Sequence, residues 1–167
     1  MAAQIDEVQT FDADPQTVFA MLSDEKYIEY KCEQSASLEA TAEVSRDGNQ
    51  VRIHNRRVLP AKVPGFVKKF LGDTIPLDET QIWGPAEADG SRSATFTVDF
   101  DGQPLHFSGT IELRPDGDRT AVETKGTLKC TVRIVGGKIE GFAKGWIGKY
   151  LNKEERVGNQ WLSDHRS

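Results

Sequence analysis

The stretch from Gly137 to about Asp164 constrains this chain most, because its apolar residues recur at spacings of three and four, as on one face of a long helix. The opposite face carries glycines among lysines, and each glycine inside a helix costs roughly 1 kcal/mol relative to alanine. The helix is therefore marginal alone, and the rest of the chain must supply an apolar trough for it. The apolar stripe comprises Ile139, Phe142, Ala143, Trp146, Ile147, Tyr150, Val157 and Trp161, and the glycine face Gly137, Gly141, Gly145 and Gly148.

The N-terminal part of the sequence predicts one strand and then two short helices. Residues 2–11 alternate loosely between apolar and polar, as a strand does. Asp14 and Pro15 suit the N-cap and first turn of a helix. A second short helix is predicted from about Asp24 to Glu33, with Ser23 as its N-cap.

From Ser37 the apolar period changes to two residues, which is typical of antiparallel strands. Turn sequences such as Asp47-Gly48-Asn49 separate the alternating runs. Six strands are predicted with one apolar and one wet face, in a single domain over residues 1–167. They run from Leu38 to the turn at Asp47, Val51 to Leu59, Ile75 to Trp83, Ala94 to Phe100, Leu105 to Leu113 and Val122 to Val132.

The loop from Pro60 to Gly72 is apolar and rich in aromatic residues. Its prolines exclude it from a central strand, so it forms a short helix or turn. We expect Phe66 and Phe70 at its tip to border the mouth of a cavity. The alternative is a loop that only plugs one end of the sheet.

Composition excludes several classes of protein. The net charge of −5 argues against a general nucleic-acid binder, which needs a concentrated basic surface. Cys32 and Cys130 have neither metal-site spacing nor a disulfide framework, which predicts free thiols in a reducing compartment. No signal segment or bilayer-spanning apolar run is recognisable, so we expect a cytoplasmic, soluble protein.

The order strand, two short helices, six antiparallel strands and long helix is that of the α+β helix-grip fold. The run Asp12-Ala-Asp-Pro-Gln-Thr-Val-Phe-Ala-Met-Leu-Ser-Asp resembles the start of START-like (SRPBCC superfamily) domains. Leu59-Pro-Ala-Lys-Val-Pro-Gly-Phe and Gly136-Gly-Lys-Ile-Glu-Gly further resemble an uncharacterised actinobacterial branch, a domain of unknown function. The resemblance implies a curved sheet of about seven strands around the C-terminal helix. These folds host lipid carriers, hormone receptors, polyketide cyclases and chaperone cofactors, so the resemblance implies the fold more strongly than the function.

A curved sheet and a helix that cannot fully meet leave a cavity, and such cavities are mostly apolar with a few oriented polar groups. The alternative is that aromatic side chains fill this space completely. The apolar walls are predicted to be Val51, Ile53, Phe96, Val98, Phe100, Phe107, Ile111, Val122 and Leu128, closed by Phe142, Trp146 and Tyr150.

Several polar residues share the inward register of these strands. Asn55 and Arg57 continue the face of Ile53, and Glu79 and Gln81 follow if their strand is regular. A bulge near Glu79 would instead turn these side chains outward. Hydroxyl groups of Thr124 and Tyr150 complete the predicted polar end of the cavity. His54 and His106 fall on the wet face.

Three functions fit this pattern, and no catalytic, metal-binding or cofactor-binding motif narrows them. The leading hypothesis is a binding or carrier protein for a hydrophobic small molecule such as a lipid or polyketide. A cyclase or dehydratase would use Glu79, Tyr150 or Arg57 for proton transfer in the same cavity. A protein-interaction module would use the glycine face of the last helix or the Phe66 loop. Transient contact with a membrane surface is compatible with the carrier hypothesis, and the sequence leaves the oligomeric state open.

Overall fold

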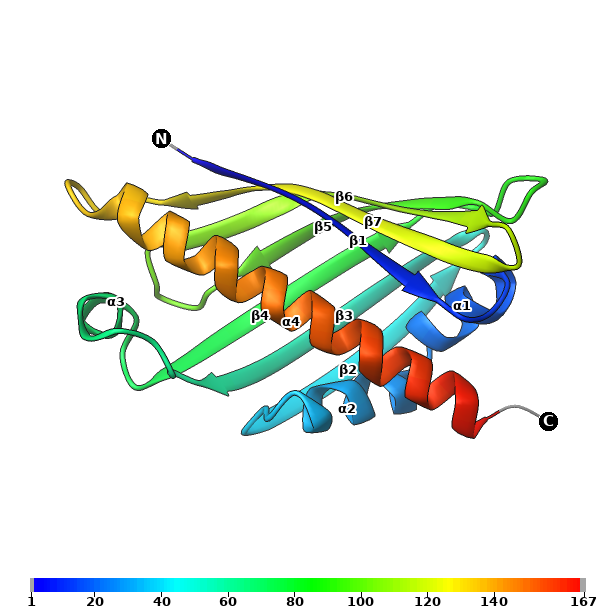
Figure 1. Cartoon of the computed structure of the whole chain (residues 1–167), viewed down its shortest axis with the longest axis horizontal. Coiled ribbons are helices and arrows are strands. Elements are labelled where there is room, and N and C mark those ends of the chain that lie inside the picture. Colours follow the sequence, from blue (N-terminus) through cyan, green and yellow to red (C-terminus); the bar gives the residue numbers. More distant parts are fainter. Residues whose placement is uncertain (1, 166–167) are drawn as a thin grey trace.

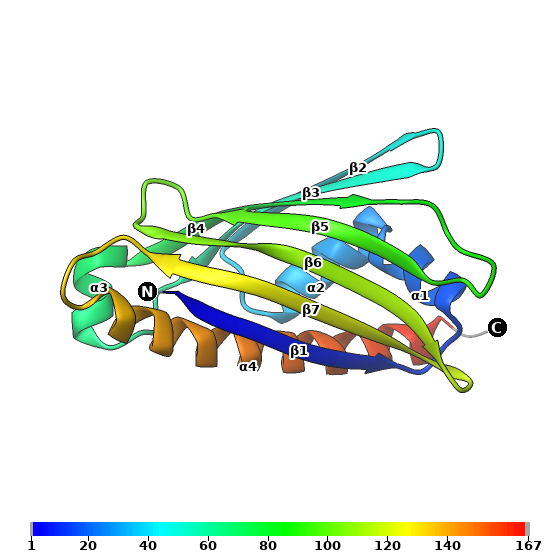
Figure 2. The same cartoon turned by 90° about the horizontal axis from the view of Figure 1, so that it is seen from above.

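The computed structural model describes residues 2–165 and is built on a seven-stranded antiparallel sheet with strand order β1-β7-β6-β5-β4-β3-β2 (Figure 1). The strands are β1 (Ala3–Phe11), β2 (Glu39–Asp47), β3 (Gln50–Pro60), β4 (Thr74–Trp83), β5 (Arg92–Asp99), β6 (Leu105–Asp116) and β7 (Arg119–Cys130). The helices are α1 (Pro15–Leu22), α2 (Glu25–Gln34), α3 (Gly65–Leu71) and α4 (Gly136–Asp164). Figure 2 shows the sheet over α4, with α1 and α2 near the C-terminal end of that helix. The α+β helix-grip prediction is confirmed.

Both short N-terminal helices begin at an aspartate N-cap. Asp14 caps α1 as predicted, because its carboxylate accepts a hydrogen bond from the Thr17 amide at 2.8 Å. Hydrogen bonds from the Thr17 side chain and then from its amide lower the pKa of Asp14. The prediction of Ser23 as the cap of α2 is wrong: Asp24 accepts from the Lys26 amide, at 2.9 Å. Ser23 instead ends α1, and its hydroxyl donates back to the Phe19 carbonyl at 2.8 Å.

Two predicted strand boundaries are also wrong. Leu38 lies before β2 and is exposed, because the strand begins at Glu39. β7 ends at Cys130 rather than Val132, since the Thr131 amide leaves the strand and donates to the Pro104 carbonyl at 2.9 Å.

Two glycines face each other across β6 and β7. Gly109 pairs with Gly126, and a Cβ at Gly109 would overlap the Lys125 carbonyl oxygen. A Cβ at Gly126 would meet the Phe107 ring at 2.6 Å. The missing side chains let the rings of Phe96 and Phe107 pack over this point, with centroids 4.8 Å apart.

α4 is held on the sheet side at both of its ends. Near its start, the buried carboxylate of Glu140 accepts a hydrogen bond from the Cys130 amide at 2.8 Å. Near its end, Gly158 is buried, and a Cβ there would lie 2.5 Å from the Phe11 ring and 3.0 Å from the Tyr27 hydroxyl. Between these points Ile139, Ala143 and Ile147 are buried, in agreement with the predicted stripe.

Gly137, Gly141 and Gly145 face open space, as predicted for the outer face of the helix. Within residues 2–165, no helix combines the length and the apolar composition that spanning a membrane requires.

Two glycine substitutions in α4 should have opposite effects on stability. Gly145→Ala adds a methyl group where no atom lies within 4 Å, so it should raise the free energy of unfolding by about 0.5–1 kcal/mol. Gly158→Ala forces a methyl group against Phe11 and should lower it by about 1–3 kcal/mol. Equilibrium urea unfolding of both variants checks this, and equal shifts would contradict the close packing at Gly158.

Candidate functional site

A cavity of about 130 Å³ lies between the sheet and the inner face of α4. Its wall is mainly aliphatic and aromatic, so it excludes polar solutes more readily than apolar ones. An apolar cavity of about 150 Å³ is known to hold a benzene molecule. The lining residues are Gln9, Leu22, Ile28, Lys31, Ile53, Asn55, Arg57, Leu59, Leu77, Glu79, Gln81, Trp83, Phe96, Val98, Phe100, Phe107, Ile111, Val122, Thr124, Trp146, Ile147, Tyr150, Leu151 and Glu154.

One side of the cavity carries a compact group of charges. Arg57 Nη2 donates to Glu154 Oε1 at 3.4 Å, and Lys31 Nζ lies 3.9 Å from the other oxygen of that carboxylate. All three side chains are at least 86% buried, so one carboxylate balances two cations away from bulk water. Burial alone would lower the pKa of Arg57, but Glu154 and, to a smaller degree, Cys32, Glu79 and Tyr150 together outweigh burial, and the pKa is raised. Arg57 is therefore a permanent cation at the cavity wall.

Cys32 and Asn55 support the inner side of this charged group. Asn55 Nδ2 donates to the Cys32 sulfur at 3.5 Å, and Arg57 Nη1 lies 3.9 Å from the same sulfur. Cys32 and Cys130 are both free and buried. The Nε of Arg57 is buried without a hydrogen-bond partner among the described residues, so part of its donor capacity is unused.

A chain of hydrogen bonds runs along β4 at the cavity wall. Trp83 Nε1 donates to Gln81 Oε1 at 2.9 Å, and Gln81 Nε2 donates to Glu79 Oε2 at 3.2 Å. The bulge considered for this strand is absent from it: Asn55 pairs with Glu79 and Ile53 with Gln81 in unbroken register. Glu79 and Gln81 therefore point inward.

Tyr150 lies on α4 beside the charged group, four positions before Glu154. Its ring centroid lies 5.9 Å from the Arg57 guanidinium carbon and 4.7 Å from the Trp146 centroid. Burial raises the pKa of the Tyr150 hydroxyl, and the nearby Arg57 only partly offsets that rise. Tyr150 is thus a neutral phenol at neutral pH, able to donate a hydrogen bond.

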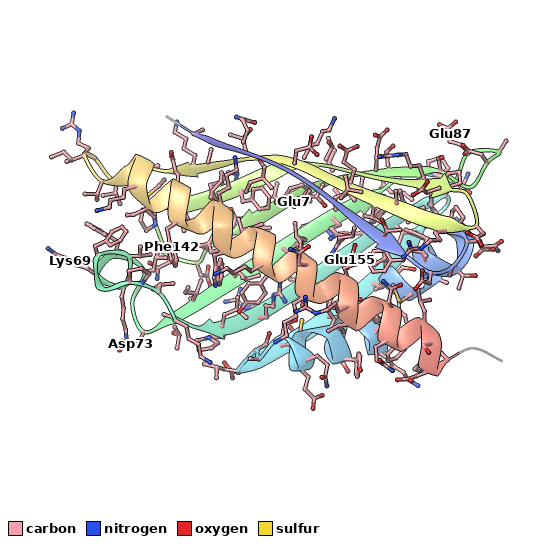
Figure 3. All side chains as sticks on the ribbon, viewed as in Figure 1. Glu7, Lys69, Asp73, Glu87, Phe142 and Glu155 are labelled. Carbon is pink, nitrogen blue, oxygen red and sulfur yellow. The ribbon has the colours of Figure 1, made fainter. Side chains whose placement is uncertain are left out.

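Most of the predicted site residues come together around the cavity, but three predicted wall residues do not. Val51 is buried in the core near the far end of β3, where it pairs with Trp83. Leu128 is buried on β7 without reaching the cavity. Phe142 lies one turn too close to the start of α4, at the α3 end of the molecule (Figure 3), and lines an outer groove instead.

Sequence reasoning missed several cavity residues, among them Gln9, Lys31, Leu151 and Glu154. Glu154 follows Tyr150 by four positions and so shares its helix face, which was a usable signal. Nothing in the sequence marked Gln9 as a cavity residue, because the pairing of β1 with β7 is what places its side chain beside α4. There Gln9 Nε2 donates to the Leu151 carbonyl at 2.8 Å.

An outer groove of about 590 Å³ adjoins the cavity at the start of α4. It is lined by Ala61, Lys62, Val63, Pro64, Gly141, Phe142, Gly145, Trp146 and Lys149. Trp146 borders both the groove and the inner cavity. Its indole is therefore part of the wall between them.

The loop residues predicted as a gate lie elsewhere. Phe66 and Phe70 are not part of the cavity lining, and the Phe66 ring packs under Lys138 Nζ at 4.7 Å. The loop meets the groove through Val63 and Pro64, upstream of the two rings. A gating role for Phe66 and Phe70 stays a prediction.

His54 and His106 are surface groups, as predicted. They pair with Asp78 and Asp99 respectively on the outer face of the sheet. Among residues 2–165, no three side chains of His, Cys, Asp or Glu lie close enough together to hold a metal ion.

A family model matches residues 6–162 of this chain. The chain belongs to that family, described as "Protein of unknown function (DUF2505)". No curated protein matches the sequence. The assignment agrees with the predicted membership of a domain of unknown function.

Solved structures share the fold at low sequence identity. The Zhui aromatase/cyclase from Streptomyces sp. R1128 aligns with a TM-score of 0.63 and 9% identity, over 98% of this chain and 94% of its own. Norcoclaurine synthase from Thalictrum flavum, in complex with dopamine and hydroxybenzaldehyde, gives 0.58 and 11%, over 100% and 90%. A START superfamily protein from Mycobacterium smegmatis gives 0.54 and 14%, over 95% and 98%. The prediction of a START-like fold is confirmed.

Replacing Glu154 should be costly, because both Lys31 and Arg57 would lose their shared counterion. We expect Glu154→Gln to lower the free energy of unfolding by about 3 to 5 kcal/mol, as for other broken buried ion pairs. Arg156→Gln, on the exposed side of the same helix, should change it by less than about 0.5 kcal/mol. Chemical denaturation at neutral pH measures both, and similar values for the two variants would contradict the role of Glu154.

Proposed function

We propose that this protein binds a hydrophobic small molecule, such as a lipid or polyketide, in the cavity between the sheet and α4. The observation that carries the proposal is the cavity itself, which has an apolar wall and a charged group confined to one side. This combination suits an amphipathic ligand, since the wall gains from burying apolar surface and the polar side fixes orientation.

The available volume limits what the ligand places inside. About 130 Å³ accepts one aromatic ring or a short acyl segment. A larger ligand would extend past Trp146 into the outer groove, which offers several times that volume. Trp146 would then contact the ligand directly, while Arg57 and Tyr150 would meet its polar group.

A second candidate is an enzyme of the polyketide cyclase or dehydratase type. It is favoured by the inward-facing carboxylate of Glu79 and the protonated hydroxyl of Tyr150, which border the same cavity and are suited to proton transfer. Two of the similar structures are of enzymes, which adds fold-level analogy only. Glu79→Gln and Tyr150→Phe separate the two candidates. A carrier releases its ligand chemically unchanged with or without these substitutions, whereas an enzyme would lose turnover in the variants.

A cytoplasmic location is part of this proposal. It is supported by the two buried free thiols, Cys32 and Cys130, which suit a reducing compartment.

Native mass spectrometry of gently purified protein should detect a co-purifying small molecule. We expect a mass above that of the bare chain. The excess mass should disappear when the protein is denatured, and the released small molecule should be recovered in an organic extract. A bare chain from several expression hosts, together with no saturable uptake of fatty acids or polycyclic dyes, would count against the carrier.

Trp146→Ala should fold and lose affinity for fatty-acid and polycyclic dye probes. Trimming a large residue from a filled core costs about 3 to 5 kcal/mol, whereas a side chain beside an empty space has fewer contacts to lose. We therefore expect only a modest drop in thermal stability but a clear drop in dye affinity, measured by fluorescence titration.

Trp161→Ala is the matched control. Trp161 lies farther along α4, where it packs against Tyr27 and Tyr30 with centroids 5.5 and 5.2 Å away, outside the cavity. It should lose stability and retain probe binding. Unchanged probe binding in Trp146→Ala would contradict the carrier hypothesis and favour the hypothesis of a protein-interaction module.

A further inference from the structure

The charges of this chain are strongly segregated along the sequence. Residues 60–72 and 129–149 together hold eight basic residues and one acidic residue, a net charge of +7. The remainder holds thirteen basic and 25 acidic residues, a net charge of −12, which accounts for the overall −5. The eight basic residues are Lys62, Lys68, Lys69, Lys129, Arg133, Lys138, Lys144 and Lys149.

The fold brings these two segments to one end of the molecule. α3 and the loop that precedes α4 both lie at that end of the molecule (Figures 1 and 2). Figure 3 shows Lys69 pointing outward there, whereas Glu87 lies at the opposite end. All eight basic side chains are exposed. We call residues 60–72 and 129–149 the basic end.

Acidic residues near the basic end offset only part of its charge. The one acid within it, Glu140, is buried and bonded to the Cys130 amide. Asp73 pairs with Lys68 at 3.4 Å, and Asp101 pairs with Arg56 at 2.6 Å. Asp99 faces His106, as described above. Apart from Lys68, the basic residues form no ion pair with any residue between 2 and 165.

The basic end also presents an apolar side chain that the fold holds in water. Ile134 is fully exposed and has a φ of 71°, a left-handed conformation that a β-branched residue rarely adopts. The loop is fixed on both sides, by the Thr131–Pro104 backbone bond and by Glu140 at the Cys130 amide. Such strain persists only where the surroundings impose it. The fixed loop therefore imposes both the left-handed conformation of Ile134 and the exposure of its side chain.

We propose that the basic end docks on the surface of an anionic lipid bilayer, with Ile134 inserted among the headgroups and the surrounding lysines and Arg133 facing lipid phosphates. Basic residues near an anionic leaflet each add to binding, and an apolar side chain adds the interfacial anchor that charge alone lacks. A soluble polyanion would use the lysines but would give no reason for an exposed isoleucine. The proposal does not depend on the ligand of the cavity, although the outer groove opens beside the same end through Lys62 and Lys149.

Vesicle flotation with the full chain tests the proposal. We expect the protein to float with vesicles of phosphatidylcholine and phosphatidylglycerol in equal parts, and to stay in the soluble fraction with phosphatidylcholine alone. Raising the salt from about 0.1 M to about 1 M shortens the screening length from about 10 Å to about 3 Å and should release most of the protein. Equal flotation with both vesicle types, or with neither, would overturn the proposal.

Lys69→Glu with Arg133→Glu should weaken binding to the anionic vesicles by at least about 25-fold, since each basic residue near the surface is worth about fivefold. Lys26→Glu with Arg156→Glu makes the same change in net charge at exposed positions outside the basic end. That control should weaken binding much less, and equal losses would mean that only net charge matters.

Ile134→Asn separates docking from folding. Asparagine tolerates positive φ better than isoleucine, so the variant should melt at the same temperature as the wild type or higher, yet bind the vesicles several-fold more weakly. Leu38→Asn, at another exposed apolar residue, should bind like the wild type. Undiminished vesicle binding by Ile134→Asn would refute the anchor. Equally tight binding to a soluble polyanion, or a wild-type dimer that Ile134→Asn makes monomeric, would assign the basic end to a different partner.

Discussion

The whole arrangement depends on how α4 is fastened to the sheet. At its start, the buried Glu140 carboxylate holds the end of β7. At its end, Gly158 allows the backbone against Phe11, and Asn159 exchanges hydrogen bonds with β1 at the Asp12 amide and the Thr10 carbonyl. Between these contacts the curvature of the sheet carries it away from the helix. The cavity is the space left between the curved sheet and the part of α4 that lies between these two contacts.

Burial of the charged group on the cavity wall costs free energy, because charged side chains lose hydration when they are buried. Lys31, Arg57 and Glu154 come from three different elements and meet where little water reaches them. Buried ion pairs contribute little net stability compared with well-packed apolar residues. A packed apolar wall would serve folding equally well, so the net stability of the fold does not account for these charges.

The fold could be predicted from the sequence because its signals are local. The change of period at Ser37, the Asp47-Gly48-Asn49 turn and the stripe along α4 each follow from spacing alone. The inward register of Asn55, Arg57, Glu79 and Gln81 followed from strand alternation once the strands were regular. Gln9 and Lys31 could not be found in this way, because their places depend on how β1 and α2 pack against distant elements. Phe142 was misplaced because a helical stripe does not show where along its length the sheet turns away.

The position of β1 has a consequence for how this molecule assembles. Ala3 pairs with Leu128, and α4 packs on the resulting β1–β7 edge, so neither contact can form before most of the chain is present. Contacts between residues so distant in sequence form slowly, because the chain loses the entropy of closing a long loop before the contacts can stabilise it. Until they form, the aromatic face of the sheet around Phe96 and Phe107 is open to solvent. A hydrophobic molecule that adsorbed on this face before α4 docked would be enclosed by the helix, and it would reach the interior without passing Trp146.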